Sequence, residues 1–307
     1  MPAHRRNVVG GVVAVSDAMQ QHVALFLQTA AARRLSPHTV DSYRRDLQIL
    51  MESGLAAENI KTVDIRRLVV SETRRGIHPS SIARRLSAWR MFFGDLQRRG
   101  IIEVNPAIGV RAPKKNAPLP RALTPDETAH FLDAPTAKKD IWAMRDRALL
   151  ELLYSSGLRI GEALSLNAPD LDLSSGMVHI KRGKGGRGRV APLGDTAKTA
   201  LKQWLAVRPV GGDALFVNHR GGRLSARAVQ HKMATRATTL GYAGKISPHV
   251  LRHSCASHFL QSSGDLRATQ ELLGHQNISS TQIYTRLDFQ NLARAYDRAH
   301  PRAADKK

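Results

Sequence analysis

The stretch SPHVLRH, residues 247–253, is the most informative segment of this chain. Ser247 followed by Pro248 predicts the start of a helix, because serine caps helix N-termini and proline is favoured in the first turn. His249 and Arg252 then lie three residues apart, on one face of that turn and near its exposed amide groups, which attract anions. A histidine beside an arginine at an anion site suggests proton transfer to or from a phosphate. A capped helix with a solvated basic start is an equally good interpretation of this stretch by itself.

The segment GLRIGE, residues 157–162, is a second cluster. It places Arg159 at a predicted helix start and Glu162 one turn later. Alone, this pattern favours a helix cap with a surface ion pair, which contributes little to stability.

A third cluster contains Lys184, in the glycine-rich segment 182–189 between two short apolar runs, and it predicts a β-hairpin with a basic tip. A solvated loop is the simpler interpretation of that tip, and its spacing does not fit a phosphate-binding P-loop.

The fourth cluster is LLGH, residues 272–275, followed by Tyr284. Gly274 predicts a helix C-cap, and a tyrosine at helical spacing is more often a core residue than a reactive one. The histidines do not form a metal motif, because no C-x-x-C or H-E-x-x-H spacing exists, and we expect no metal site.

Taken together, the four clusters could serve one chemistry. Two arginines would neutralise a phosphate, two histidines would bond to it, a lysine would supply a proton and a tyrosine would be the nucleophile.

The balance of charge points to an anionic partner. The 307 residues include 47 Lys and Arg against 25 Asp and Glu, a formal net charge of +22. Such a charge repels itself in a compact chain, so nucleic acid is the leading candidate partner. An anionic membrane surface is the rival, but no apolar run is long enough to span a bilayer, and we expect no membrane partner. The single cysteine, Cys255, excludes an intrachain disulfide, and we expect a cytoplasmic protein.

Length and patterning predict two domains. We expect a flexible tail over residues 1–16, a helical domain over residues 17–104, a linker rich in proline and lysine over residues 105–120, and a second domain over residues 121–307. The first domain is predicted to be an all-α bundle. The second is predicted to be mixed α+β and mainly helical, with a small antiparallel sheet formed by the hairpin. Individual helices are predicted to open at Ser36-Pro37 and at Thr124-Pro125 and to cover residues 80–99 and 145–154.

In chain order, these clusters resemble the tyrosine recombinase family. The residues that carry the resemblance are Arg159, Lys184, His249, Arg252, His275 and Tyr284. The similarity extends over nearly the whole chain. The segments 263–267 and 270–275 and the tail over residues 287–302 are most similar to the Xer branch, and within it to the XerC group. The resemblance implies that residues 17–104 are a core-binding, SAM-like DNA-binding domain and that residues 121–307 are the catalytic domain.

The resemblance also implies an enzyme that breaks and rejoins DNA. The nucleophile would attack a scissile phosphate and form a 3′-phosphotyrosyl bond, releasing a 5′-hydroxyl. A covalent intermediate conserves the energy of the broken bond, so neither ATP, a metal nor any other cofactor is expected. The implied roles are Tyr284 as nucleophile, His249 as base, Lys184 as general acid, Arg159, Arg252 and His275 as phosphate ligands, and Glu162 as support.

The family further implies partners. These are a double-stranded DNA site of the dif type, a XerD-like partner recombinase in a heterotetramer and an FtsK-like translocase, with chromosome dimer resolution as the outcome. The apolar stripe of Phe289, Leu292, Ala293 and Tyr296 would dock on a neighbouring subunit, or it packs on its own domain. Candidate phosphate contacts, each of which could equally be a solvated surface residue, are Arg44, Arg45, Arg84, Arg85, Arg90, Lys114 and Lys115.

Two other functions remain open at this point. A type IB topoisomerase would use the same tyrosine chemistry as a monomer without pairing two sites, and the Xer-like tail argues against it. A non-enzymatic DNA-binding protein is the second alternative, because residues 265–284 could form a helix-turn-helix. That alternative would leave the constellation of Arg159, Lys184 and Arg252 without a function.

Overall fold

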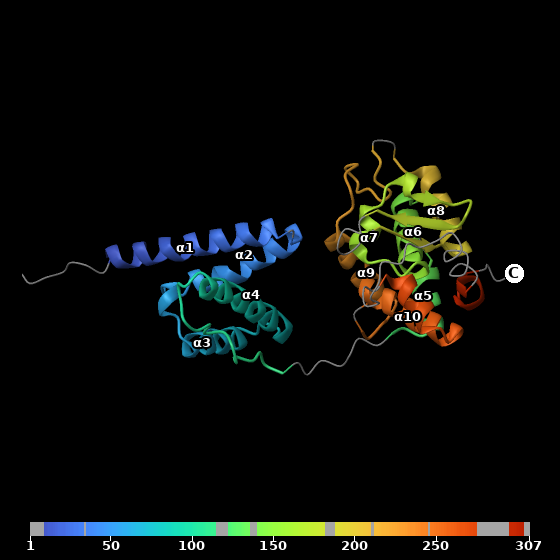
Figure 1. Cartoon of the computed structure of the whole chain (residues 1–307). Helices are drawn as coiled ribbons and strands as arrows, with labels where there is room; N and C mark the ends of the chain where they lie inside the picture. The colour runs from blue at the N-terminus through green and yellow to red at the C-terminus, as the bar shows by residue number, and fades with distance from the viewer. Residues whose placement is uncertain are drawn as a thin grey trace, which may run out of the picture. The chain divides into compact units, whose positions relative to one another are not determined.

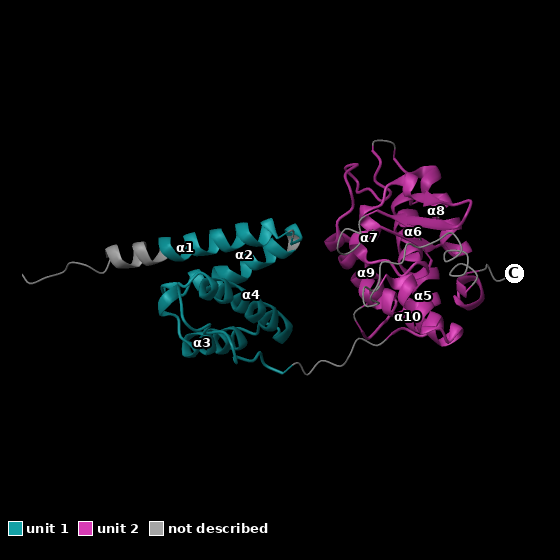
Figure 2. Cartoon of the chain, in the orientation of Figure 1, with its two compact units in different colours: residues 1–117 teal, residues 118–307 magenta. Residues whose placement is uncertain are grey.

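The chain divides into two compact units, residues 1–117 and residues 118–307 (Figure 2). This division agrees with the two predicted domains and falls within the predicted linker. Within the described ranges, no helix has both the length and the apolar character needed to cross a bilayer. The computed structural model describes residues 9–33, 35–114, 122–135, 140–181, 188–209, 212–244, 246–274 and 295–303.

Unit 1 is an all-α bundle, as predicted (Figure 1). Its elements are α1 (Val9–Ala32), α2 (Pro37–Met51), the short 3₁₀ turn η1 (Ala57–Asn59), α3 (Thr62–Arg74) and α4 (Pro79–Arg98). The predicted start of α2 is confirmed, because the Ser36 hydroxyl accepts a hydrogen bond from the Thr39 amide at 3.1 Å. The indole of Trp89 on α4 donates to the Asp46 carbonyl on α2 at 2.8 Å. This bond joins the two helices inside the bundle.

Helix α1 begins earlier than the sequence indicates. A flexible tail was expected over residues 1–16, but the chain is helical from Val9 onward. The glycines at positions 10 and 11 suggest a break in the pattern. They are tolerated because a helix that has already nucleated gains one hydrogen bond for each residue it adds, which offsets the roughly 1 kcal/mol cost of a glycine.

Unit 2 is mixed α+β and mainly helical, as predicted. Its elements are α5 (Pro125–Asp133), α6 (Ile141–Ser155), α7 (Ile160–Ser165), the 3₁₀ turn η2 (Ala168–Asp170), β1 (Leu171–Asp172), β2 (Met177–Ile180), β3 (Arg189–Pro192), α8 (Asp195–Val207), α9 (Ala226–Thr239), α10 (Pro248–Ser263) and α11 (Leu266–Leu273). The strands form one antiparallel sheet in the order β1-β2-β3. The predicted hairpin is confirmed in its two strands, with Val178 opposite Ala191 and Ile180 opposite Arg189. Strand β1 was not predicted, because two residues are too few to show an alternating pattern.

Helix α6 lies in the interior of unit 2 and contacts both α8 and α10 (Figure 1). It is buried without interruption from Ala148 to Ser155. Because its apolar residues occupy all sides, the helix is a core helix rather than an amphipathic surface helix. The loop that follows it contains Gly157 and Arg159, so the packing of α6 determines where that loop begins.

Residues 295–303 pack against unit 2 itself. Tyr296 is fully buried, and its hydroxyl lies 2.6 Å from the Ser155 hydroxyl at the end of α6. Arg302 pairs with the buried carboxylate of Glu151 at 2.7 Å. In the predicted apolar stripe, Tyr296 therefore packs on its own domain. The other members of the stripe, Phe289, Leu292 and Ala293, lie outside the described residues.

A pH-dependent contribution to stability is predicted for His300. Its ring is buried and stacks on Tyr296, with the ring centroids 4.6 Å apart, and burial lowers the pKa of His300 to about 3. In the unfolded chain the same ring titrates near pH 6.5, so the unfolded state binds a proton that the folded state does not. The stabilising contribution is therefore complete above about pH 6.5 and is lost progressively as the pH falls toward 3.

The measurement is thermal unfolding near pH 7 and near pH 5 of the wild type and of His300→Phe, which keeps a ring in the stack but cannot titrate. We expect the melting temperature of the variant to fall less than that of the wild type between these two conditions. His253→Phe, at an exposed position of α10, is the control and should follow the wild type. Equal slopes for His300→Phe and the wild type would contradict the prediction.

Candidate active site

The first turn of α10 carries His249 and Arg252, as predicted. Ser247 caps this helix, and its hydroxyl accepts a hydrogen bond from the Val250 amide at 3.4 Å. The two functional side chains differ in environment, since His249 is exposed whereas Arg252 is only 7% exposed. One helical turn therefore presents a histidine to solvent and holds an arginine inside the domain.

Arg252 is bound to two backbone carbonyls. Its Nη1 donates to the Gly157 carbonyl, and its Nη2 donates to the Leu273 carbonyl at 2.8 Å. These bonds join α10 to the loop before α7 and to the end of α11. Burial, followed by repulsion from Arg159 and Arg189, lowers the pKa of Arg252 to about 10, so the side chain remains cationic at neutral pH.

Arg159 is the N-cap residue of α7, and Glu162 lies in its first turn. The Glu162 carboxylate accepts from Arg159 Nη1 at 2.8 Å and from the Arg159 backbone amide at 2.9 Å. The cap and the ion pair that the sequence indicates are both present. The pair is not a surface pair, however, because Glu162 is only 5% exposed, whereas the Arg159 side chain is 35% exposed. A buried carboxylate thus orients a guanidinium group that solvent can reach.

A third arginine, Arg189 on β3, joins this cluster and was not predicted. Its Nη2 donates to Glu162 at 2.8 Å, and its Nη1 donates to the Leu272 carbonyl at 2.9 Å. As the last residue of the glycine-rich run 182–189, it is easily attributed to a solvated tip. The available signal was the alternation of the strand, because Arg189 and Ala191 share a face and Ala191 is directed into the core.

Glu162 is held in its charged form despite its burial. Burial by itself raises the pKa of this carboxyl, but the Arg189 guanidinium and the hydrogen bonds from Arg159 outweigh burial and hold the pKa below its usual value. Arg159, Arg189 and Arg252 carry three positive charges against the one negative charge of Glu162. The cluster therefore has a net positive charge, which suits it to bind a phosphate.

The structure brings together part of the predicted catalytic set. Arg159, Glu162 and Arg252 belong to one connected cluster, and His249 lies in the same helical turn as Arg252. Gly274, the predicted C-cap of α11, is confirmed in a left-handed conformation with φ of 63°. The other predicted catalytic residues, which lie outside the described residues, are Lys184, His275 and Tyr284.

His258, further along α10, has a structural role. Its ring nitrogens lie 2.8 Å from the Tyr154 hydroxyl and 2.7 Å from the Leu123 carbonyl. Both partners belong to the interior of unit 2, so this histidine supports packing between α10, α6 and the chain before α5. In the part of the chain that the structure describes, no group of three or more His, Cys, Asp or Glu side chains is arranged to hold a metal ion.

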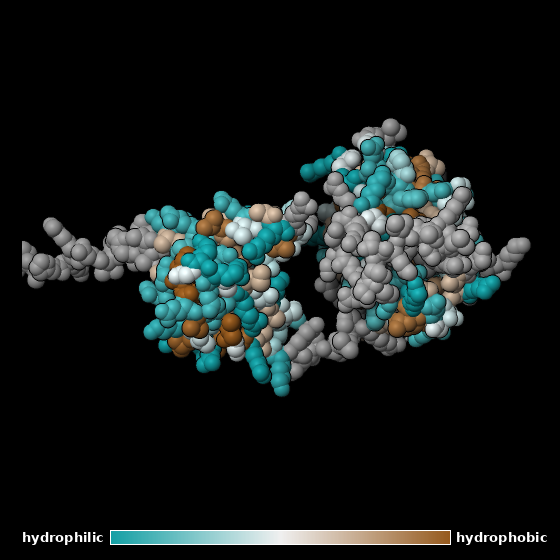
Figure 3. Space-filling view, in the orientation of Figure 1, coloured by the Kyte–Doolittle hydropathy of each residue, from teal (hydrophilic) through white to brown (hydrophobic). Residues whose placement is uncertain are grey.

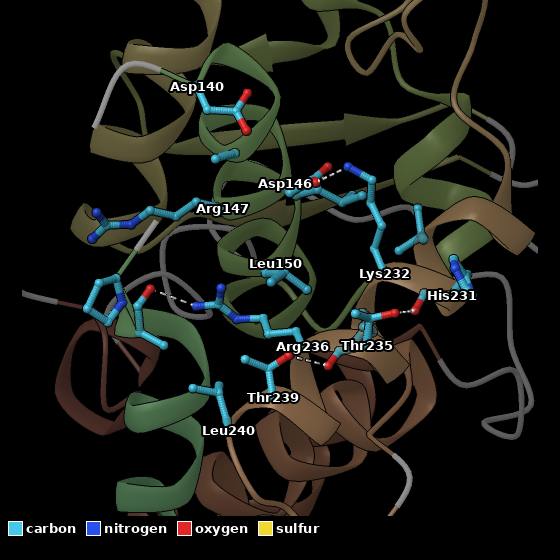
Figure 4. Close-up of a pocket in the computed structure, with 16 residues that line it drawn as sticks. Asp140, Asp146, Arg147, Leu150, His231, Lys232, Thr235, Arg236, Thr239 and Leu240 are labelled. Atoms are coloured by element: carbon cyan, nitrogen blue, oxygen red, sulfur yellow. Dashed lines mark hydrogen bonds and ion pairs between the residues drawn. The ribbon is translucent and has the colours of Figure 1, made fainter. Parts of the chain in front are cut away.

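A pocket of about 550 Å³ lies between α6 and α9 (Figure 4). Its lining combines apolar side chains such as Leu150 with the ion pair of Asp146 and Lys232, whose charged atoms are 2.5 Å apart. Arg236, also on the lining, donates to the Ala134 carbonyl at 2.9 Å. The arginines that surround Glu162 do not line this pocket, so it is separate from the candidate active site.

Several of the basic residues predicted to contact DNA are exposed on unit 1. On the face of unit 1 shown in Figure 3, hydrophilic side chains dominate and apolar ones are scattered among them. Arg84 also forms an ion pair with the buried carboxylate of Asp46. Lys115 lies outside the described residues. The exposed candidates are Arg44, Arg45, Arg84, Arg90 and Lys114.

Arg85 and Arg90 make contacts within unit 1. Arg85 on α4 forms an ion pair with the buried carboxylate of Glu72 on α3. Arg90 donates to the carbonyl of Ala107 at 3.2 Å and to that of Val110. The two side chains therefore connect α4 to α3 and to the segment that follows α4, whatever contacts they make with DNA.

Comparisons with known proteins cover both units. Residues 121–291 match the phage integrase family, and residues 23–100 match the phage integrase N-terminal SAM-like domain. The chain is 46% identical over 289 residues to tyrosine recombinase XerC of Chromobacterium violaceum, covering 93% of this chain and 96% of the relative. It is also 46% identical over 296 residues to tyrosine recombinase XerC of Alcanivorax borkumensis, covering 94% and 96% of the two chains.

The fold is similar to that of a lambda integrase tetramer bound to a Holliday junction. The TM-score is 0.69 at 19% sequence identity, over 92% of this chain and 86% of the other. This likeness concerns the fold, whereas the family matches and the XerC relatives concern the sequence. The chain therefore belongs to the phage integrase family of tyrosine recombinases, enzymes that cleave and rejoin DNA through a tyrosine nucleophile.

Proposed function

We propose that this tyrosine recombinase exchanges strands between double-stranded DNA sites of the dif type and thereby resolves chromosome dimers. The observation that carries the proposal is the connected cluster of Arg159, Glu162 and Arg252, which has the family's chain order and a net positive charge. The XerC relatives favour this function over a type IB topoisomerase or a non-catalytic DNA-binding protein. A chromosomal substrate implies that the protein acts in the cytoplasm.

The arginines would stabilise the phosphate during attack. Arg159 is accessible, and its planar guanidinium can donate two parallel hydrogen bonds to phosphate oxygens, which a lysine cannot do. Arg252 uses one N–H of each terminal nitrogen for a carbonyl, and a guanidinium has five N–H groups in total. Fixed positive charges beside phosphate oxygens that gain negative charge in the transition state are typically the largest single stabilising effect in such a site.

The proton transfers are assigned to the remaining members of the predicted set. The oxygen of Tyr284 forms a bond to phosphorus while the bond from phosphorus to the 5′-oxygen breaks. A free tyrosine has a pKa of about 10, so its proton must pass to a base, and His249 is proposed as that base. Lys184 would protonate the departing 5′-oxygen, and His275 would donate to a non-bridging oxygen. The covalent bond to Tyr284 conserves the energy of the cut, so no ATP or metal is required.

Strand exchange would need two DNA sites and four subunits. A XerD-like recombinase is proposed to supply the partner subunits of a heterotetramer, and an FtsK-like translocase is proposed to activate it. The 5′-hydroxyl of one strand would attack the phosphotyrosine of the other, which releases Tyr284 and seals the joint. The proposed phosphate contacts, among which the exposed side chains of unit 1 are best placed, remain Arg44, Arg45, Arg84, Arg85, Arg90, Lys114 and Lys115.

A nicked suicide duplex with a dif-type site tests the nucleophile. A nick beside the scissile phosphate lets the short leaving strand diffuse away, so a covalent adduct accumulates. We expect the wild type to give an adduct on a denaturing gel, and Tyr284→Phe to bind the duplex without forming one. An adduct with Tyr284→Phe would place the nucleophile elsewhere. Binding without any adduct by the wild type, also after a XerD-like partner is added, would overturn the proposed function.

Arg252→Lys tests the forked arginine. A lysine keeps the charge but cannot reach both the Gly157 and the Leu273 carbonyls, and a buried carbonyl left without a donor costs roughly 1–3 kcal/mol of stability. We expect a lower melting temperature and single-turnover cleavage slower by about 10²-fold, because small displacements of a catalytic group have effects of that size. Arg298→Lys, at an exposed position of unit 2, is the control and should match the wild type in both measurements. The role assigned to Arg252 fails if the two variants behave alike.

A further inference from the structure

We infer that Arg189 is a positioning residue of the active site, which fixes the Arg159 loop and the end of α11 relative to each other without binding the scissile phosphate. This inference rests on the proposed function, since it concerns the same site. It adds a residue outside the predicted catalytic set.

Arg189 spans two segments that are far apart in the sequence. Its Nη2 donates to Glu162 on α7, and its Nη1 donates to the Leu272 carbonyl on α11. Its side chain is only 12% exposed, against 35% for Arg159. Both terminal nitrogens of Arg189 thus face acceptors of the protein, whereas Arg159 presents its guanidinium to solvent. This is the geometry of a connecting residue rather than of a phosphate ligand.

The last turn of α11 shows what Arg189 holds. The final carbonyls of a helix have no partner within the helix. In α11 the Gly274 amide pairs with the first two of these carbonyls, and arginines pair with the last two, Arg189 with that of Leu272 and Arg252 with that of Leu273. The end of α11, two residues before the predicted catalytic position 275, is therefore fixed by the same cluster that orients Arg159.

Gly274 provides an independent observation. A Cβ built on this glycine would lie 2.7 Å from both Cδ and Nε of Arg189, which is closer than real side chains approach. The Arg189 side chain thus crosses directly over the cap of α11. Gly264, the cap of α10, is also left-handed, with φ of 66° against 63° and ψ of 1° against 51°, but nothing lies within 4 Å of its would-be Cβ. These two left-handed caps therefore differ in their contact with Arg189.

Loss of this connection should affect the cleavage rate more than DNA binding. Without Arg189, the buried Glu162 carboxylate keeps Arg159 as its one hydrogen-bond donor among the described residues. The Leu272 carbonyl also loses the donor that Arg189 provides. The Arg159 guanidinium can then shift relative to Arg252. A displacement of about 1 Å in a catalytic site can cost about 10²-fold in rate. DNA affinity comes from many phosphate contacts and should change little.

The first experiment compares Gly274→Ala with Gly264→Ala in the full chain. Both variants carry the strain of an alanine in a left-handed cap, and only the first displaces Arg189. Single-turnover cleavage of the suicide duplex and the dissociation constant for the same duplex are measured. We expect Gly274→Ala to cleave about 10²-fold more slowly than the wild type with nearly unchanged affinity. Gly264→Ala should cleave at close to the wild-type rate. Equal effects of the two variants on cleavage would overturn the inference.

The second experiment combines Gly274→Ala with Arg189→Ala, which removes the side chain that the new methyl group would strike. We expect Arg189→Ala alone to cleave slowly, and the added Gly274→Ala to slow cleavage no further than Gly264→Ala does. Effects that simply multiply would mean that the two positions act independently, and would contradict the inference.

Thermal unfolding of the same variants tests the contact between Arg189 and the cap of α11 without requiring that the protein cleaves DNA. The melting temperature should fall more for Gly274→Ala than for Gly264→Ala, and this excess should vanish when Arg189 is alanine. That result is expected whether or not the wild type forms a covalent adduct. Absence of the excess would show that Arg189 does not hold the cap, even if the adduct forms.

Discussion

The buried carboxylate of Glu162 is the group on which the arginine cluster depends. A charge in the interior is tolerated only when it is paired and hydrogen-bonded, because desolvation otherwise favours the neutral form. Glu162 meets this condition through the amide and side chain of Arg159 and through the side chain of Arg189. The same bonds fix the direction of the Arg159 guanidinium while part of it stays accessible. The position of the carboxylate therefore sets the position of the group that would meet a phosphate.

This arrangement depends on packing well beyond the cluster. The loop that carries Arg159 begins where the core helix α6 ends, at Ser155. The Ser155 hydroxyl lies 2.6 Å from that of Tyr296 and accepts from the Gly194 amide at 2.8 Å. The C-terminal segment of unit 2 is thus attached a few residues before Arg159. A disturbance of this segment can reach the site through Ser155, because interiors are close-packed and transmit strain.

Local signals in the sequence were sufficient to predict the starts of α2, α5 and α10 and the two strands of the hairpin. Ser36, Thr124 and Ser247 each cap a helix. The hydroxyl of each residue accepts a hydrogen bond from the backbone amide three residues further along the chain. The geometry of a cap involves only those few residues, so it leaves a readable pattern. The same holds for the left-handed Gly274 at the end of α11. The start of α1 was misjudged, because glycines at positions 10 and 11 weaken the pattern without ending the helix.

By itself, the sequence determined the two-domain organisation, the helices whose caps or apolar faces it marks, the two strands of the hairpin and the order of residues that resembles the tyrosine recombinases. Only the tertiary structure decided that Arg189 joins the site, that Glu162 is buried, and that Arg90 supports the fold of unit 1 through carbonyls. These contacts could not be predicted from the sequence because they join residues that are far apart along the chain. Arg252 donates to a carbonyl 95 positions away, and a bond of that kind leaves no period, spacing or composition in the segments that it joins. Caps and apolar faces, by contrast, arise from neighbours in the chain, so the chain itself records them.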